Sequence, residues 1–91
     1  MAYLLGRFKT DDFDAWKEQF DADPLGRRQA ARGHRVLRNA EDPNEFFVQT
    51  EFASADEARS FRDKLMGSDA FASMNAVLPP AVAEEVDAQT Y

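Results

Sequence analysis

Cysteine is absent from the 91 residues of this chain, and histidine occurs once, as His34. Without thiolates the chain can form no disulfide, zinc ribbon, iron–sulfur cluster or cysteine nucleophile. A single imidazole also excludes metal sites that need two or three histidine ligands. We therefore expect no metal site.

Long apolar runs and an excess of basic residues are absent as well. No apolar run approaches the ~20 residues of a membrane-spanning helix, and the first residues lack the basic start and apolar stretch of a secretory signal. Lysine and arginine number 11 against 17 aspartates and glutamates, which gives a net charge of −6. This charge repels nucleic acids and anionic membranes. We expect a cytoplasmic protein that binds neither.

Glycine is scarce, with four residues scattered singly along the chain. The sequence therefore contains no glycine-rich phosphate loop and no nucleophile elbow. Nucleotide binding has no support in the sequence.

A regular succession of strand and helix patterns is present, and it fills the chain without a linker. Strands show apolar residues at every second position, and helices show them at spacings of three and four. In the first half of the chain we predict a strand over 2–9, a helix that follows the capping residues 10–12 and is interrupted by Pro24, and a helical segment over 25–32. Next come a strand over 34–39, a turn over 40–44 and a strand over 45–52. The last elements are a helix from the Ser54 capping box to Gly67 and a strand over 81–91.

The order β-α-β-β-α-β predicts one α+β domain over residues 1–91 with a ferredoxin-like fold. Its four-stranded antiparallel sheet carries two helices on one face. Because phenylalanine and valine occur at both parities of the strands, we expect the open face to be partly apolar. An apolar sheet face of that size implies a partner.

Four motifs carry a resemblance that covers nearly the whole chain. They are Phe-Lys-x-x-Asp-Phe-x-x-Trp at 8–16, Asp-Pro-Asn at 42–44, Glu-Phe-x-Ser-x-x-Glu-Ala at 51–58 and Ser-Asp-x-Phe-x-x-Met-Asn at 68–75. The chain resembles the dimeric α/β-barrel superfamily that contains the antibiotic-biosynthesis monooxygenases and small cyclase-like proteins. The resemblance implies a homodimer in which two sheets close a barrel. It leaves the chemistry open, because one fold hosts many functions.

The haem-degrading branch of this superfamily has an asparagine on the first strand, a tryptophan ending the third strand and a haem-ligating histidine late in the second helix. The matching positions here are Arg7, Phe52 and Asn75, and all three differ. Without the axial histidine no iron ligand is evident, because His34 sits elsewhere in the chain. The resemblance therefore implies no haem, and we expect no cofactor.

An apolar cluster lies on the predicted helices and forms either a ligand pocket or the core of a small domain. Its members are Phe13, Trp16, Phe20, Phe61, Phe71 and Met74. If a pocket exists, Trp16 is its best candidate, because a buried indole N–H needs a partner. We expect the pocket between the sheet and the helices, with these ligand-binding residues: Trp16, Phe52, Phe71, Met74 and Asn75.

Two charged or titratable side chains are candidates for a catalytic role in such a pocket. His34 is the natural general base near neutral pH, although a surface histidine is the alternative. Arg7 or His34 would stabilise an anion formed on the substrate.

A basic segment stands out in an otherwise acidic chain. Residues 27–38 contain five arginines and no acidic residue, so the remainder of the chain sums to −11 (−6 − 5). These arginines are Arg27, Arg28, Arg32, Arg35 and Arg38. The segment binds an anionic substrate group, or it pairs with Glu84, Glu85 and Asp87 of the same or a partner subunit.

Two functions are compatible with these observations. The first is a small dimeric barrel protein with an apolar small-molecule pocket and no implied turnover. The second is a cofactor-independent monooxygenase or polyketide cyclase acting on a small aromatic or polyketide-like compound. Whether the chain is an enzyme is left open at this stage.

Overall fold

The computed structural model describes residues 1–69 and 76–91, and its element order matches the predicted fold. The elements are β1 (Ala2–Lys9), α1 (Phe13–Ala22), α2 (Arg27–Ala30), β2 (Gly33–Asn39), β3 (Asp42–Phe52), α3 (Ala55–Met66) and β4 (Ala76–Glu84).

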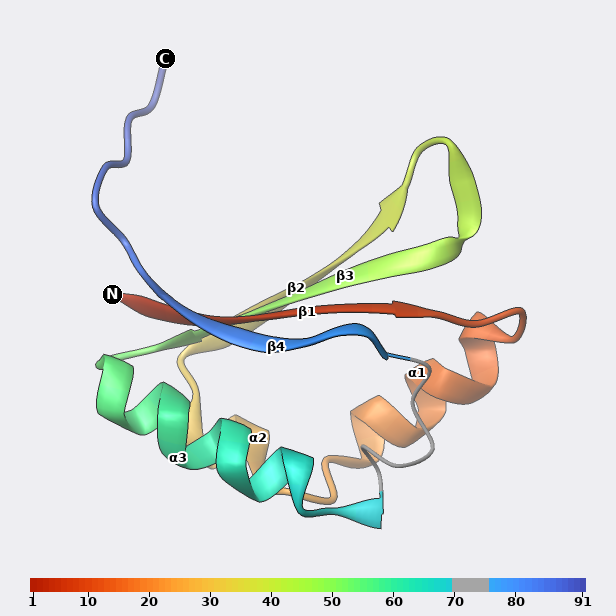
Figure 1. Cartoon of the computed structure of the whole chain (residues 1–91), viewed down its shortest axis with the longest axis horizontal. Helices are drawn as coiled ribbons and strands as arrows, with labels where there is room; N and C mark the ends of the chain where they lie inside the picture. Colours follow the sequence, from red (N-terminus) through yellow and green to blue (C-terminus); the bar gives the residue numbers. More distant parts are fainter. Residues whose placement is uncertain (70–75) are drawn as a thin grey trace.

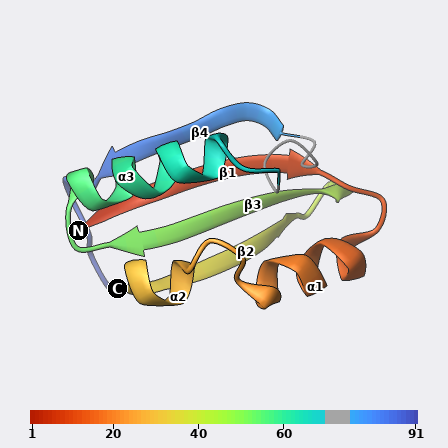
Figure 2. The same ribbon diagram turned by 90° about the horizontal axis from the view of Figure 1, so that it is seen from below.

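The strands form one antiparallel sheet in the order β2-β3-β1-β4 (Figure 1). Figure 2 shows α1, α2 and α3 together on one face of this sheet. This is the ferredoxin-like α+β arrangement that the sequence predicts.

The register of the central strands decides which residues face the helices. Leu4, Gly6 and Phe8 of β1 lie opposite Thr50, Val48 and Phe46 of β3. Leu4, Phe8, Phe46 and Phe52 are buried, so the even-numbered positions of β1 and β3 form the inner face. The odd-numbered positions point to the open face.

The two long helices begin where local capping signals predict. The Asp12 carboxylate accepts a hydrogen bond from the Ala15 N–H at 3.1 Å at the start of α1. The Ser54 hydroxyl accepts one from the Glu57 N–H at 3.2 Å at the start of α3. Both caps satisfy backbone donors that the first turn of a helix leaves free.

The second helical segment is shorter than predicted. The sequence predicts helix over residues 25–32, but α2 spans only Arg27–Ala30. Gly26 has a φ of 71° and Ala31 is extended, and neither conformation continues a helix. The expected cap is present, because the Asp23 carboxylate accepts hydrogen bonds from the N–H groups of Arg27 at 2.7 Å and Arg28 at 3.1 Å.

The hairpin between β2 and β3 is tighter than predicted. β3 begins at Asp42 instead of residue 45, and Asn39 pairs with Asp42. Asn39 and Asp42 side chains each accept a hydrogen bond from a backbone N–H two residues on, which stabilises this end of the hairpin.

The position of the last strand differs most from the prediction over 81–91. β4 spans Ala76–Glu84 and contains Pro79 and Pro80. It lies at the edge of the sheet and pairs with β1, and prolines are tolerated at an edge because one side of the strand needs no ladder donors. The register shift between Leu5 and Arg7 marks an irregularity beside Gly6, as the glycine suggests.

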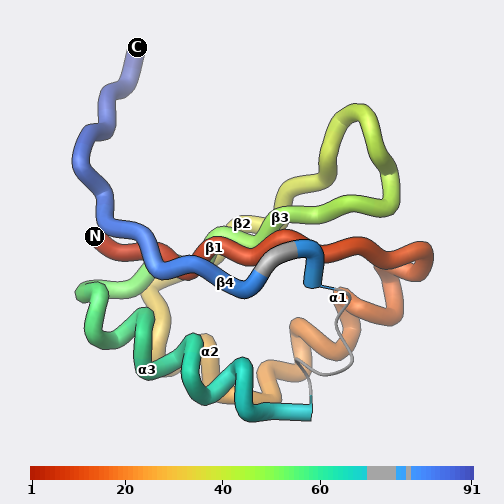
Figure 3. The backbone as a smooth tube through the Cα atoms, in the orientation of Figure 1, coloured from red at the N-terminus to blue at the C-terminus, as the bar shows by residue number. Residues whose placement is uncertain are grey.

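The chain leaves the sheet after Glu84 and extends away from the rest of the molecule (Figure 3). The Tyr3 hydroxyl donates to the Glu85 carboxylate at 3.0 Å, and the Glu85 N–H donates to the Met1 carbonyl at 2.9 Å. Beyond these contacts, Val86 is 95% exposed.

The sequence predicts no membrane-spanning helix and no metal site, and both features concern residues 1–69 and 76–91 here. No helix there has the length and hydropathy that crossing a membrane requires. The same residues contain no group of three or more histidine or carboxylate side chains placed to hold a metal ion. The cytoplasmic location stays a prediction.

Candidate functional site

A cavity of about 570 Å³ lies between the helices and the inner face of the sheet. Its volume falls in the range of pockets that bind small molecules. The lining comes from β1, β3, α1, the α1–α2 connection, α2, α3 and β4, and most of it is apolar. The described lining residues include Leu4, Gly6, Trp16, Phe20, Asp23, Leu25, Arg27, Val48, Thr50, Phe61 and Asp69.

Stacked aromatic rings form the α1 wall of this cavity. The ring centroids of Trp16 and Phe20 are 4.8 Å apart, and Trp16 stacks on Phe8 of β1 at 4.3 Å. Phe13 stacks on Phe46 at 4.4 Å. The helical spacing of Phe13, Trp16 and Phe20 predicts this arrangement, because residues three and four apart share one face of a helix.

The predicted aromatic cluster thus serves two purposes. Of its members, Phe61 is buried in the core beside Phe52, whereas Trp16 and Phe20 are half-buried and line the cavity. The core role of Phe61 is thus observed, and ligand binding against Trp16 and Phe20 stays a prediction.

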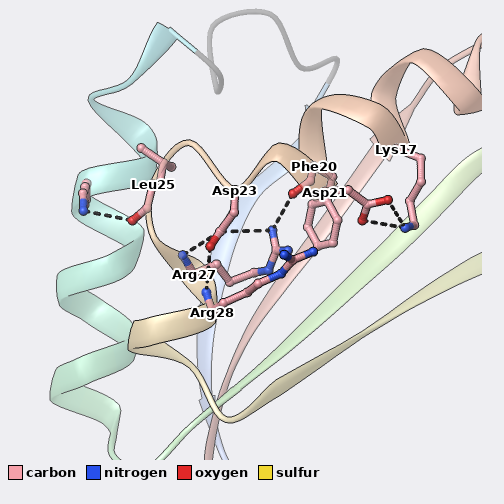
Figure 4. Close-up of polar contacts among 8 residues, drawn as sticks. Lys17, Phe20, Asp21, Asp23, Leu25, Arg27 and Arg28 are labelled. Atoms are coloured by element: carbon pink, nitrogen blue, oxygen red, sulfur yellow. Dashed lines mark hydrogen bonds and ion pairs between the residues drawn. The ribbon is translucent and has the colours of Figure 1, made fainter.

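Arg27 supplies a buried positive charge in the cavity wall, and its side chain is only 7% exposed. Its guanidinium carbon lies 3.6 Å from the centroid of the Phe20 ring, and its Nη1 donates to the Phe20 carbonyl oxygen at 3.1 Å (Figure 4). Burial lowers the pKa of Arg27, while the Asp23 carboxylate raises it. An arginine stays protonated despite such a shift.

Two donors of this guanidinium have no partner among the residues that the structure describes. Arg27 Nε and Nη2 are buried and make no hydrogen bond within the described part of the chain. Leaving a buried donor unsatisfied costs about 1–3 kcal/mol. The contact of the guanidinium with the Phe20 ring offsets part of this cost, since a desolvated cation–π contact contributes about 2 kcal/mol.

Asp23 organises the turn that carries Arg27. It ends α1 in the left-handed conformation with a φ of 55°. Burial raises the pKa of the Asp23 carboxyl. The hydrogen bonds from the N–H groups of Arg28 and Arg27, together with the two guanidinium charges, lower this pKa by more than burial raises it, so the net shift is downward. The Lys64 ammonium of α3 donates to the Leu25 carbonyl oxygen at 2.9 Å and ties α3 to the same turn.

His34 lies next to the cavity without lining it. Its ring meets Phe20 edge-on at 4.9 Å, and in the β2–β3 register it lies opposite Thr50. Burial lowers the pKa of His34 from 6.5, and the Arg27 and Lys17 charges lower it further. The imidazole is therefore neutral at pH 7.

Arg7 does not contribute to this cavity. It belongs to the odd-numbered residues of β1, which face away from the helices, and it is not among the described residues that line the cavity; its predicted catalytic role stays a prediction. Its Nη2 donates to both Glu45 carboxylate oxygens at 3.0 Å, and Asn39 Nδ2 donates to Glu45 at 2.8 Å. The hydrogen bonds from Asn39 and Arg7 lower the pKa of the Glu45 carboxyl. The cation that the described lining contains is Arg27, which the sequence analysis did not propose for this role.

The remaining predicted ligand-binding residues do not line the cavity or lie outside the described residues. Phe52 is fully buried and packs against Phe61 with ring centroids 5.6 Å apart, so it belongs to the core. Phe71, Met74 and Asn75 lie outside the described residues. Their predicted roles, and that of His34, stay predictions.

The basic segment divides between the interior and the surface. Arg27 is buried, and the other four arginines are exposed. Within residues 1–69 and 76–91 no ion pair joins those four to Glu84, Glu85 or Asp87. Pairing with a partner subunit therefore stays a prediction.

No protein-family model and no curated protein matches the chain. Solved structures do. A proposed antibiotic biosynthesis monooxygenase from Deinococcus radiodurans matches with a TM-score of 0.69 at 14% identity, covering 100% of this chain and 98% of that chain. One from Bordetella bronchiseptica matches with a TM-score of 0.66 at 20% identity, covering 97% of each. One from Nitrosomonas europaea matches with a TM-score of 0.63 at 17% identity, covering 93% and 88%.

At these identities the likeness establishes the fold. The chain shares the ferredoxin-like fold of these antibiotic-biosynthesis-monooxygenase-like proteins, which confirms the fold that the resemblance of the four motifs implies. Activity and assembly do not follow from the fold.

Proposed function

We propose that this chain is a homodimeric barrel protein that binds a small aromatic molecule in the cavity between the sheet and the helices. The cavity walled by Trp16 and Phe20 carries this proposal. Rings that are already stacked present an apolar, rigid surface, and a planar ligand gains offset-stacking contact there at little conformational cost.

Trp16 is the only tryptophan, so its emission reports on this cavity alone. Titration with para-phenylbenzamide should shift or quench the emission saturably, because the ligand would replace water against the indole. Free N-acetyl-tryptophanamide corrects for light absorbed by the compound. Unchanged emission together with no heat in a calorimetric titration would contradict the proposal.

The homodimer is supported by the apolar character of the open face. Leu37 is 52% exposed and Leu5 is 40% exposed. Phe47 of β3 lies opposite Leu37 on one side and Arg7 on the other, with the Arg7 guanidinium carbon 5.6 Å from its ring centroid. A second copy placed sheet against sheet would cover these residues and the segment from residue 81 to the end, which carries acidic groups opposite in sign to the exposed arginines.

Sedimentation at micromolar concentration should give twice the 10.3 kDa chain mass. The interface should exceed ~1,000 Å². Leu37→Glu should shift the protein toward monomer, because a charge would be buried at the interface. Met66→Glu is the matched control, since Met66 is similarly exposed at 44% but lies on α3. A wild-type monomer would refute this assembly.

A second candidate function is cofactor-independent oxygenation or polyketide cyclisation of a small phenolic compound. The names of the structural neighbours favour it. A neutral His34 would accept the phenolic proton, and Arg27 would stabilise the resulting anion. Because His34 lies beside Phe20 and not in the lining, the substrate would have to reach the β2 side of that ring. Oxygen consumption on addition of a phenol separates oxygenation from binding alone.

A further inference from the structure

The two unpartnered donors of Arg27 lie side by side. Nε and Nη2 occupy one edge of the planar guanidinium, and both are buried without a hydrogen-bond partner among the described residues. The spacing of two such donors matches the two oxygens of a carboxylate, which accept a parallel pair of hydrogen bonds.

The neighbouring acceptors serve other donors. The Phe20 carbonyl oxygen accepts from Nη1, on a different edge of the guanidinium. The Asp23 carboxylate accepts from the backbone N–H groups of Arg27 and Arg28, and its nearest approach to the guanidinium is 3.9 Å, at Nη1. Within the described part of the chain, acceptors therefore lie on the Nη1 side of the guanidinium, and the edge formed by Nε and Nη2 has none.

The other charged side chains that line the cavity do not supply an acceptor for Nε and Nη2 of Arg27. Among the described lining residues, the charged side chains are Asp23, Arg27 and Asp69. Asp69 is exposed, so solvent and salt screen its repulsion of an anion. Arg27 is the one cation among them, and it lies against the same Phe20 ring that forms the aromatic wall.

We propose that the cavity selects an aromatic carboxylate, whose carboxylate pairs with Nε and Nη2 of Arg27 while its ring lies against Trp16 and Phe20. The inference rests on the proposed function and adds the charge of the ligand to it. Because both nitrogens are covered by protein atoms, this pairing requires the Arg27 guanidinium to turn that edge toward the cavity on binding.

Two compounds of nearly the same shape test this in the wild-type protein. Para-phenylbenzoate carries the carboxylate, and para-phenylbenzamide replaces it with a neutral amide. Calorimetric titration should give a dissociation constant at least about tenfold lower for the carboxylate, because it accepts a charge-assisted bidentate pair, whereas the amide offers one neutral acceptor oxygen and turns an N–H donor toward the second nitrogen. The protein's net charge of −6 opposes this preference, so general attraction of anions cannot produce it.

Variants locate the preference. Arg27→Gln should bring the two dissociation constants to within about twofold, and Arg27→Lys should keep only part of the preference, because lysine lacks the planar fork. Arg28→Gln is the matched control: it removes the same charge from the next residue, which is exposed, and should leave the preference unchanged. Circular dichroism checks that each variant is folded.

The outcomes separate this inference from the proposed function. Equal binding of the two compounds to wild type would overturn the carboxylate site and leave aromatic binding intact. Failure of both compounds to bind would overturn the proposed function and the inference with it. A preference lost in Arg28→Gln and kept in Arg27→Gln would place the anion on the exposed arginines and overturn the inference. If Arg27→Gln does not fold, Arg27→Lys and Arg28→Gln still locate the preference, because only the change at Arg27 should weaken it.

Discussion

Replacing Phe52 with alanine should lower the free energy of unfolding by about 3–5 kcal/mol, the usual range for a phenylalanine removed from a packed core. Phe52 has no exposed surface and packs against Phe61 across the β3–α3 interface. A domain has on the order of 5–15 kcal/mol in total, so this one change should remove a large share of the stability.

Urea unfolding followed by circular dichroism measures this effect, at one fixed protein concentration because a dimer unfolds in a concentration-dependent way. Met66→Ala is the control. Met66 is 44% exposed near the end of α3, so its truncation should change the unfolding free energy by less than about 0.5 kcal/mol. Similar losses in both variants would mean that Phe52 is not a core residue.

Local signals allow most of the fold to be predicted from the sequence. The capping oxygens of Asp12 and Ser54 act on residues three positions away, so their effect is readable without tertiary structure. The bounds of β4 and its edge position cannot be predicted from such local signals. Pro79 and Pro80 are compatible with a strand only because that strand lies at the edge of the sheet, and edge position depends on the pairing of the whole sheet.

The candidate site was partly predictable for a similar reason. Trp16 follows from helical spacing, which is local. The side of the sheet on which Arg7 lies could not be predicted, because β1 has apolar side chains on both faces and the sequence alone does not say which face the helices cover.

Arg27 was missed as a buried cation because its burial comes from the turn between α1 and α2. Two left-handed residues, Asp23 and Gly26, fold this turn back so that Arg27 lies over Phe20. In the sequence it is one of five neighbouring arginines. The only local hint was Asp23 four residues earlier, and that hint indicates a helix cap more strongly than a buried ion pair.

The substitution Gly6→Leu, on the sheet side of the cavity, should abolish ligand binding and leave the protein folded. Gly6 lines the cavity on β1, and a Cβ atom added there would meet only the Val48 Cβ, at 4.0 Å, which is ordinary contact. Because an added Cβ fits, a leucine at this position should extend into the cavity beside Trp16. The unfolding free energy should stay unchanged or rise, since the leucine becomes buried and glycine is a poor strand residue.

The most direct test of the central claim is calorimetric titration of para-phenylbenzamide into wild type, Gly6→Leu and Gly33→Leu. Gly33 begins β2 away from the cavity, and a Cβ there meets nothing within 4 Å, so it is the matched control. Wild type and Gly33→Leu should bind the amide equally well, and Gly6→Leu should show no saturable heat. Undiminished binding to a folded Gly6→Leu protein would contradict the claim that the aromatic ligand occupies the cavity between the sheet and the helices.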